Sequence, residues 1–451
     1  MAVWSEVRFV TLEGAGRVDA EYYQPIYIRE RAFLRALPNV RLGNVAFVTD
    51  GQHGYHKVDP DSDIKHITAK CVVDNLVVAD GADHLAAETH LNNLRSILEA
   101  DDIILSTAGT IGNCGIVTDD VLPANIDQDV ARIHIYDQAE LSPWYVSTFL
   151  NCELGRLQTT FETTGQVQKH LSLGAVRNLL IPRLSDEKAI ADTAAMAWRQ
   201  RKESTRLYTE AESLLLHALG LDTLDTAHEL TYERNFHEVA AAGRFDAQYY
   251  HPEKAHVLEQ LAKLPGHTIG EHFLSINDLL VPPAKDTGEV VQNYDLDEAL
   301  RFFLDEIEPL PTCELGSTKK RFQHGDVVVS RLRSYLKEIA LVESPPSANC
   351  IGSTEFIVLR GFRTDVSPEL LTVYLRSSPV QKILKWCQDG SQHPRFKEEE
   401  LRAIKLPDCL LDAQDDIKRL VRAAIDAHRD AKRLLDAAKR RVEAMILGSE
   451  G

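Results

Sequence analysis

Two stretches of the chain repeat apolar residues at alternating spacings of four and three. One runs through nine positions from Ile190 to Ala218, and the other through nine positions from Ile417 to Met445. A 3.5-residue repeat of this length predicts a long helix with a coiled-coil seam. The seam positions on which the prediction rests are Ile190, Ala194, Ala197, Arg201, Tyr208, Leu215, Ile417, Val421, His428, Leu435, Val442 and Met445.

Neither helix has enough apolar seam to be stable alone, so we expect the two to pack on each other in antiparallel orientation. The fourth seam position is polar in both helices, with Arg201 in one and His428 in the other. A polar seam residue can fix register or orientation. Alternatively, both side chains extend from the edge of the seam into solvent. The pattern alone favours neither interpretation.

Short β-rich runs bounded by polar residues predict buried strands ahead of each helix. Residues 101–106 (DDIILS) correspond to 325–330 (GDVVVS), and Leu179–Pro182 corresponds to Ile404–Pro407. Glycines at positions 109 and 112 follow the first of these runs and indicate a tight hairpin turn. The succession of strands, short helices and one long helix therefore occurs twice.

The duplication is clearest in a motif near the start of each copy. RVDAEYYQP at 17–25 returns as RFDAQYYHP at 244–252, an offset of 227 with six of nine positions identical. A repeat of this length sets the fold prediction. The paired tyrosines that it contains, Tyr22-Tyr23 and Tyr249-Tyr250, are expected to pack each domain onto the long helices.

The predicted fold is a mixed α/β (α+β) protein with a pseudo-twofold internal repeat, in which two antiparallel coiled-coil helices separate the duplicated domains. We place the first domain at 1–184, the central spacer helix and linker at 185–224, the second domain at 225–410 and the C-terminal spacer helix at 411–451.

The composition indicates folded domains and the cellular compartment in which we expect the protein. The chain has 451 residues, of which 44% are hydrophobic and 26% charged, as expected of folded domains. No run of 18 apolar residues and no leader pattern occurs, so we expect a cytoplasmic protein without a membrane span. The seven cysteines form no CxxC pair, so neither a disulfide framework nor a metal site is expected.

The ordered double series resembles the specificity (S) subunit of type I restriction-modification systems. The motifs that carry this resemblance are RVDAEYYQP (17–25), ADDIILSTAGTIGNCGIV (100–117), TGQVQKHLSLGAVRNLLIP (164–182) and the helix that follows, each with a counterpart in the second half. Single motifs are loose, but the ordered double set is specific and spans essentially the whole chain.

The resemblance implies a subunit that binds double-stranded DNA and performs no chemistry. Each variable domain would be a target-recognition domain that reads one half of a bipartite site. The resemblance also implies two methyltransferase (modification) subunits and translocase-nuclease (restriction) subunits as partners. S-adenosylmethionine and ATP-Mg are expected on those partners, with no cofactor on this chain.

The formal net charge of −18 is unusual for a DNA-binding protein. Residues 17–184 carry 14 Lys and Arg against 22 Asp and Glu, and residues 244–410 carry 20 against 25. Positive charge is concentrated at 319–337, where six basic residues meet one acid. These candidate contacts to phosphates or guanine edges are Lys319, Lys320, Arg321, Arg331, Arg333 and Lys337. The alternative is a solvated pair of strands.

Two further groups are candidates for DNA contacts. The polar loops after Gly165 and Gly390 supply Gln166, Gln168, Lys169, His170, Gln392, His393 and Arg395. These residue types can pair with adenine or guanine edges, although a structural turn at the helix entry would explain the loops equally well. In the first copy, which lacks the basic stretch, we add Gln52, His53, His56 and Lys57.

Methyltransferase, nucleotide-binding and nuclease motifs are not found, so an enzyme is the least favoured class. The runner-up interpretation is a coiled-coil adaptor whose two globular domains bind proteins and do not read DNA. The sequence leaves open which bases are recognised and which domain reads which half-site.

Overall fold

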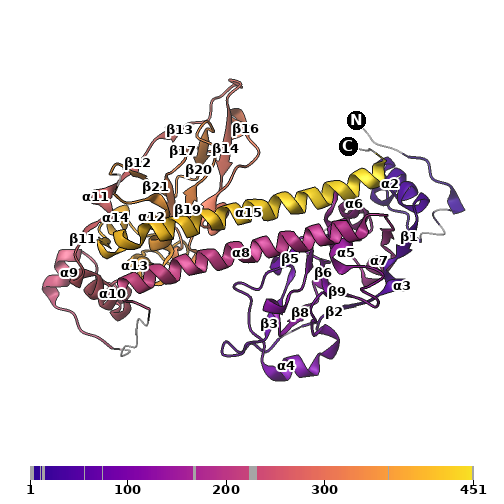
Figure 1. The fold of residues 1–451 in the computed structure, drawn as a ribbon, viewed down its shortest axis with the longest axis horizontal. Coiled ribbons are helices and arrows are strands. Elements are labelled where there is room, and N and C mark those ends of the chain that lie inside the picture. Colours follow the sequence, from indigo (N-terminus) through magenta and orange to yellow (C-terminus); the bar gives the residue numbers. More distant parts are fainter. Residues whose placement is uncertain are drawn as a thin grey trace. The chain divides into compact units, whose positions relative to one another are not determined.

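The fold is described from a computed structural model. The structure describes residues 5–10, 12, 16–54, 56–73, 75–165, 169–222, 231–363 and 365–448. The chain divides into two compact units (Figure 1). Unit 1 is Met1–Lys202 together with His428–Gly451, and unit 2 is Glu203–Ala427. The four segments expected from the sequence are continuous stretches of the chain, whereas each compact unit contains one part of α8 and one part of α15.

Unit 1 is built on a six-stranded sheet with the order β2-β9-β6-β7-β5-β4. The strands are β2 (Ala46–Asp50), β4 (Val72–Val73), β5 (Asn75–Val77), β6 (Ile103–Ser106), β7 (Cys114–Ile116) and β9 (Val130–Ile135). Two strand pairs accompany it: β1 (Asn39–Arg41) with β10 (Leu180–Pro182), and β3 (Lys65–Ile67) with β8 (Ala124–Ile126). The short helices are η1 (Glu21–Tyr23), α2 (Pro25–Ala36), α3 (Leu42–Val45), η2 (Ala69–Cys71), α4 (Ala87–Asn92), η3 (Leu94–Ser96), η4 (Asp119–Val121), α5 (Pro143–Asn151), α6 (Glu153–Phe161) and α7 (Leu173–Asn178).

Unit 2 has two five-stranded sheets, with the orders β12-β21-β18-β19-β15 and β13-β17-β20-β14-β16, and a separate strand pair of β11 with β22. The strands are β11 (Gly266–Thr268), β12 (Phe273–Ile276), β13 (Leu279–Leu280), β14 (Val290–Tyr294), β15 (Phe303–Leu304), β16 (Leu310–Pro311), β17 (Lys319–Phe322), β18 (Val327–Ser330), β19 (Ile339–Val342), β20 (Cys350–Gly352), β21 (Phe356–Gly361) and β22 (Lys405–Pro407). The short helices are α9 (Phe236–Ala242), η5 (Ala247–Tyr250), α10 (Pro252–Lys263), α11 (Ile269–His272), η6 (Asp297–Leu300), η7 (Thr312–Glu314), η8 (Ser334–Leu336), α12 (Pro368–Arg376), α13 (Ser378–Cys387) and α14 (Glu398–Arg402).

The main sheets of the two units share one topology. The order β2-β9-β6-β7-β5 in unit 1 corresponds to β12-β21-β18-β19-β15 in unit 2, with antiparallel pairing except for one parallel pair, β5–β7 and β15–β19. The register agrees as well, since Ile103 faces Ile133 and Val327 faces Leu359. The duplicated fold predicted from sequence is therefore confirmed.

Two long helices contribute to both units. The α8 helix spans Glu187–Leu219 and α15 spans Cys409–Leu447, so that 33 and 39 residues give lengths of about 50 and 58 Å. In unit 2, Leu215 shares a buried cluster with Ile417, and the Ser204 hydroxyl donates a 2.7 Å hydrogen bond to the Ala424 carbonyl. Ser204 lies nearer the N-terminus of α8 than Leu215 does, and its partner Ala424 lies nearer the C-terminus of α15 than Ile417 does. The helices therefore pair in antiparallel order.

Most of the predicted seam residues are buried. The buried ones are Ile190, Ala194, Ala197, Leu215, Ile417, Val421, His428 and Val442, whereas Arg201, Tyr208, Leu435 and Met445 are partly exposed. Because His428 is buried, the interpretation in which its side chain extends from the seam into solvent is wrong for this residue. In unit 1, the apolar seam joins the domain core, since Ile190 and Val442 share a buried cluster with Ile103 of the sheet.

The duplicated RVDAEYYQP-type motif makes the same contacts in both units. Arg17 pairs with Asp19 and donates to the carbonyls of Phe161 and Thr163. Arg244 pairs with Asp246 and likewise donates to two carbonyls at the end of α13. The motif therefore ties the start of each copy to the end of its second short helix after the sheet.

The paired tyrosines of the motif contact the short helices of their own unit. Tyr22 and Tyr23 pack edge to face and share a cluster with Phe161 of α6. Tyr249 lies against Lys254 and donates to Glu400, 2.9 Å away. Because the arginine of the motif is anchored on the short helices, its tyrosines contact those helices. Tyr249 also packs against the buried cluster that contains Leu215 of α8 and Ile417 of α15.

A buried carboxylate lies at the entrance of the central hairpin in each unit. Asp102 accepts hydrogen bonds from Arg132 at 2.6 Å and His134 at 2.9 Å. Asp326 accepts two from Arg360, both at 2.7 Å. These pairs fix the start of β6 and β18 to the neighbouring strands β9 and β21.

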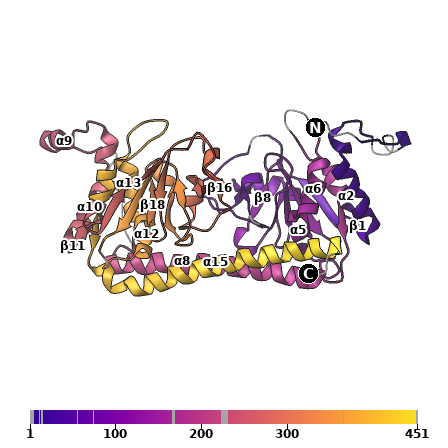
Figure 2. The ribbon, with the colours of Figure 1, turned by 90° about the horizontal axis from the view of Figure 1, so that it is seen from above.

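The core of unit 2 includes residues of β18, α12 and α15, and Figure 2 shows α12 between the sheet and the long helices. In the part of the chain that the structure describes, no helix is long and apolar enough to cross a membrane.

Candidate nucleic-acid interface

The hairpin turns after β6 and β18 are the centre of the candidate interface. Turn 1 comprises residues 107–112 and turn 2 comprises residues 331–337. Each turn contains two left-handed backbone positions. In turn 1 these are Gly109 and Gly112, with φ of 66° and 85°, and in turn 2 they are Arg333 and Lys337, with φ of 48° and 54°. Left-handed backbone is costly for residues with a Cβ, and such strain is concentrated at functional sites.

Turn 2 is joined to the polar loop that the sequence singled out separately. The Arg333 amide donates to the Pro394 carbonyl at 2.9 Å, and the Phe396 amide donates to the Arg331 carbonyl at 3.1 Å. The loop after Gly390 therefore lies on the hairpin and not at the entry of α15. This position favours the surface-reading interpretation of the loop over a turn that caps the long helix.

One carboxylate orders two of the predicted arginines. Glu355 accepts from Arg331 at 2.8 Å and from Arg395 at 2.8–3.1 Å. The hydrogen bonds from Arg395, followed by those from Arg331, lower the pKa of Glu355 to about 2. The carboxylate is therefore ionised at neutral pH and holds both guanidinium groups with their remaining donors at the surface.

The other basic residues of the stretch divide into two sets. Lys320 donates to the Phe356 carbonyl at 2.8 Å, and its pKa is lowered by burial and by the nearby Arg331. Lys319 is paired with Asp295 at 3.4 Å and Arg321 with Glu289 at 3.5 Å. Lys320 thus belongs to the turn 2 cluster, whereas Lys319 and Arg321 are held by acids elsewhere on the second sheet.

Turn 2 also presents residues at its tip. Arg333 lies 3.3 Å from the His393 ring nitrogen Nδ1. Tyr335 and Lys337 are exposed, as are Gln392 and His393 of the loop. From below, Arg376 of α12 donates to the carbonyls of Lys337 and Ile339, both at 2.7 Å, and thereby supports the backbone of the turn.

Unit 1 builds the same turn and loop with different side chains. The Leu171 amide donates to the Thr107 carbonyl, and His170 pairs with Thr164, as Phe396 with Arg331 and Arg395 with Asp389 in unit 2. The counterparts of Arg331, Glu355 and Arg395 are therefore Thr107, Asp129 and His170. Lys169 is 3.2 Å from Glu21. The predicted residues Gln166 and Gln168 lie outside the described residues.

The remaining candidates of unit 1 lie on a neighbouring loop. Gln52 accepts from Asn93 at 2.6 Å, and His53 pairs with Asp50 at 3.0 Å. Lys57 lies 3.9 Å from Glu88. His56 packs against His66 with ring centroids 4.4 Å apart, and burial lowers the pKa of both imidazoles. Both rings are therefore biased toward the neutral form.

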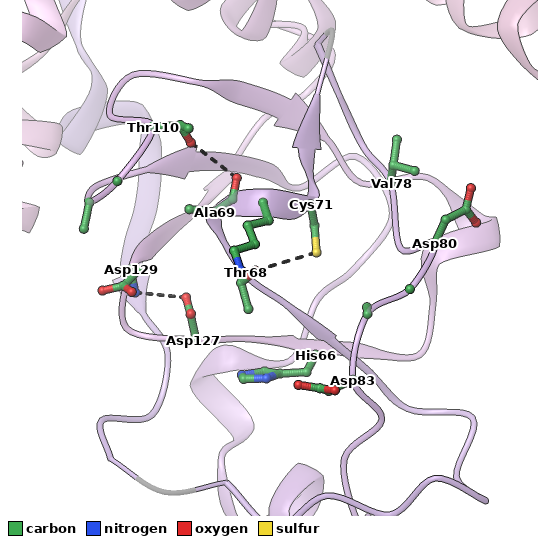
Figure 3. A pocket seen from close by; sticks show the side chains of 15 residues that line it. His66, Thr68, Ala69, Cys71, Val78, Asp80, Asp83, Thr110, Asp127 and Asp129 are labelled. Carbon is green, nitrogen blue, oxygen red and sulfur yellow. Dashed lines mark hydrogen bonds between the residues drawn. The ribbon is translucent and has the colours of Figure 1, made fainter. Parts of the chain in front are cut away.

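A cavity of about 690 Å³ opens beside turn 1 in unit 1 (Figure 3). Its lining comprises His66, Thr68, Ala69, Lys70, Cys71, Val78, Asp80, Gly81, Ala82, Asp83, Ala108, Gly109, Thr110, Asp127 and Asp129. Burial raises the pKa of Asp127 to about 6, with the neighbouring Asp129 adding to the rise. Among the described residues no cluster of His, Cys, Asp and Glu is arranged to hold a metal ion.

Sequence reasoning missed Glu355, Asp129 and the cavity. Glu355 and Asp129 are single acids in stretches of ordinary composition, and the partners of Glu355 lie 24 and 40 residues away along the chain. The one available signal was the repeat itself, because 129 and 355 are separated by nearly the same offset as the duplicated motifs.

Comparison with known proteins gives structural likenesses only. No protein-family model and no curated protein matches the chain. The chain is similar to the S subunit of a type I restriction-modification system from M. genitalium, with a TM-score of 0.39 and 13% identity over 90% of this chain and 94% of that one. It is also similar to the HsdS subunit from Thermoanaerobacter tengcongensis, with a TM-score of 0.29 and 15% identity over 91% and 97%.

A third similar structure comes from work on complex assembly and conformational transition of the type I R-M system, with a TM-score of 0.29 and 16% identity over 91% and 98%.

Proposed function

We propose that the chain is the DNA-specificity subunit of a type I restriction-modification complex. Unit 1 and unit 2 each read one half of a bipartite, asymmetric DNA site, and the chain itself is not catalytic. Two methyltransferase subunits that bind S-adenosylmethionine, and translocase-nuclease subunits that use ATP-Mg, supply the chemistry. The target is double-stranded DNA, and we expect a cytoplasmic setting.

The observation that carries the proposal is one hairpin turn built twice with different side chains. Turn 1 and turn 2 occupy the same place in the same sheet topology, yet Thr107, Gly109 and His170 replace Arg331, Arg333 and Arg395. A symmetric dimer reads a palindrome. Two covalently joined readers with the same scaffold and different surfaces instead suit a site whose halves differ.

A duplicated apolar surface supports the docking of two identical partners. Phe9 and Phe236 stand at equivalent positions and are 71% and 76% exposed, while Val18 and Phe245 are 86% and 78% exposed. We define these four residues, Phe9 and Val18 of the first copy and Phe236 and Phe245 of the second, as the duplicated apolar surface. Because both copies of the repeat carry them, we assign them to two copies of one partner, the methyltransferase subunit.

The acidic balance of the chain fits a reader that does not hold DNA alone. Charge neutralisation of phosphates dominates the affinity for DNA. With a net charge of −18, the chain needs basic partner surfaces around the duplex. We therefore expect weak binding by the isolated chain and tight, specific binding by its complex with the methyltransferase.

The test is selection of bound sequences from random duplexes with this chain co-purified with its methyltransferase. Two short, unrelated motifs at constant spacing are the expected result. A stable complex that enriches no sequence would overturn the proposal and favour the alternative, a coiled-coil adaptor with two protein-binding domains. Binding of S-adenosylmethionine by the isolated chain would contradict its non-catalytic role.

A further inference from the structure

The cavity of unit 1 occupies the position that the arginine cluster occupies in unit 2. Ala108, Gly109 and Asp129 line the cavity, and their counterparts in unit 2 are Leu332, Arg333 and Glu355. In unit 2 the acid accepts from two guanidinium groups. In unit 1 neither counterpart of those arginines is an arginine, so the acid is left lining the cavity.

Asp129 has an available carboxylate. Its amide donates to the Asp127 side chain at 2.9 Å, which fixes the bend of the backbone (Figure 3). Its carboxylate makes no hydrogen bond to any residue that the structure describes, and its side chain lines the cavity. Asp127 therefore acts as a positioning residue, and Asp129 as a hydrogen-bond acceptor with no partner in the described part of the chain.

His66 contributes a buried polar side chain to the same cavity. Its side chain lines the cavity and is only 9% exposed, yet its Nε2 atom has no hydrogen-bond partner among the described residues. A buried polar atom without a partner is costly. The neutral imidazole can donate one hydrogen bond from this nitrogen, which suits an acceptor on a ligand that enters the cavity.

A cavity that carries both an acceptor and a donor matches one base edge in the major groove. Adenine presents an N6 amino group that donates and an N7 atom that accepts, whereas guanine presents two acceptors. Arg331, Arg333 and Arg395 supply only donors, which suit guanine. The two units therefore offer opposite chemistry to the groove.

We propose that unit 1 recognises an adenine through this cavity, with Asp129 accepting from N6 and His66 donating to N7, while turn 2 of unit 2 recognises guanine. This inference rests on the proposed function. The exposed Lys70 at the edge of the cavity is placed to meet a phosphate.

The experiment uses the full chain with its methyltransferase and the duplex found by selection. The half-site that Arg333→Ala leaves unchanged is assigned to unit 1. Each adenine in that half-site is then replaced by purine, which lacks N6, or by 7-deazaadenine, which lacks the N7 acceptor. We expect both replacements at one position to weaken binding by the parent about tenfold, the scale of one good base contact.

The variants separate the two contacts. Asp129→Ala is expected to become insensitive to the purine replacement, and His66→Ala to the 7-deazaadenine replacement. Asp129→Asn keeps an acceptor and should keep the preference for adenine. Asp61→Ala, an exposed acid of the same unit outside the cavity, is the matched control. Thermal unfolding of each variant verifies that it is folded.

The outcomes distinguish the two proposals. If the parent complex selects no bipartite site, the proposed function fails. If it selects one but the half-site of unit 1 has no adenine sensitive to these replacements, or Asp129→Ala leaves the purine effect intact, only the adenine inference fails. A preference for cytosine that depends on Asp129 alone would also overturn it.

Discussion

Gly109 of unit 1 and Arg333 of unit 2 occupy the same place in two matching turns, and both have a left-handed backbone, with φ of 66° and 48°. Glycine adopts this conformation without a steric penalty, whereas an arginine adopts it at a cost because its Cβ atom crowds the backbone. Unit 2 therefore keeps a strained residue where the fold tolerates glycine. We attribute this to the function of the Arg333 side chain.

Arg333→Gly replaces the strained residue of unit 2 with the residue that unit 1 carries at the same place. The substitution relieves the left-handed strain, so the free energy of unfolding should stay constant or rise by up to about 1 kcal/mol. Specific DNA binding should weaken by about 1–3 kcal/mol if the guanidinium reads a base. Urea denaturation and DNA titration of the complex measure the two effects. Arg333→Ala, which keeps the strain, should lose binding without any gain in stability.

Glu355→Gln tests the clamp on Arg331 and Arg395. The lowered pKa of Glu355 means that its ionised form stabilises the folded state above its ordinary pKa, and that this stabilisation is lost as pH falls toward about 2. The parent should therefore keep the contribution from pH 7 to pH 5, and the variant should lack it throughout that range. Equal stability of the two proteins at pH 7 in urea denaturation would contradict the clamp.

Removing the buried carboxylates should affect the two units unequally. Asp102→Ala removes the buried partner of Arg132, whose side chain is 7% exposed and whose remaining acid, Glu99, is 64% exposed, so we expect a loss of about 3 kcal/mol. Asp326→Ala leaves Arg360, which is 34% exposed and can regain water, so the loss should be smaller. Urea denaturation compares them. Asp102→Ala combined with Arg132→Met should recover part of the loss.

The duplicated apolar surface predicts a stepwise change in stoichiometry. Phe9→Ser and Phe236→Ser should each weaken the binding of one methyltransferase copy, and the double variant should weaken both. Light scattering of the purified complex measures the number of bound copies. Exposed Leu94→Ser is a control, because the residue 227 positions further on is Arg321 and not an apolar residue. Unchanged stoichiometry in the double variant would remove this surface from the proposal.

Helix length should set the spacing of the half-sites. A seven-residue insertion after Lys202 in α8 and after Ala427 in α15 keeps the seam in phase and adds about 10 Å. The selected spacer should grow by about three base pairs, at roughly 3.4 Å each, with both motifs unchanged. An insertion of four residues in α8 alone should instead destabilise the chain, because it shifts one side of a shared seam.

The repeat and the helix pair could be predicted from sequence because they depend on local periodicity and on residues that recur at a fixed offset. The burial of Ile190 and Val421 follows directly from that period. The joining of turn 2 with the loop at 390–395 could not be predicted, because it depends on how β18 and β21 align. The clamp by Glu355 and the buried Nε2 atom of His66 could not be predicted either, because both depend on contacts between residues that are distant in the sequence.

The discontinuity of unit 1 has a consequence for damage to the coding sequence. Ala438, Val442 and Ile446 near the end of the chain belong to the same buried cluster as Ile103 and Ile133. A premature stop shortly after Ala427 would therefore leave unit 2 whole and unravel the domain synthesised first. Ribosomes must therefore synthesise most of α15 before unit 1 can close its core.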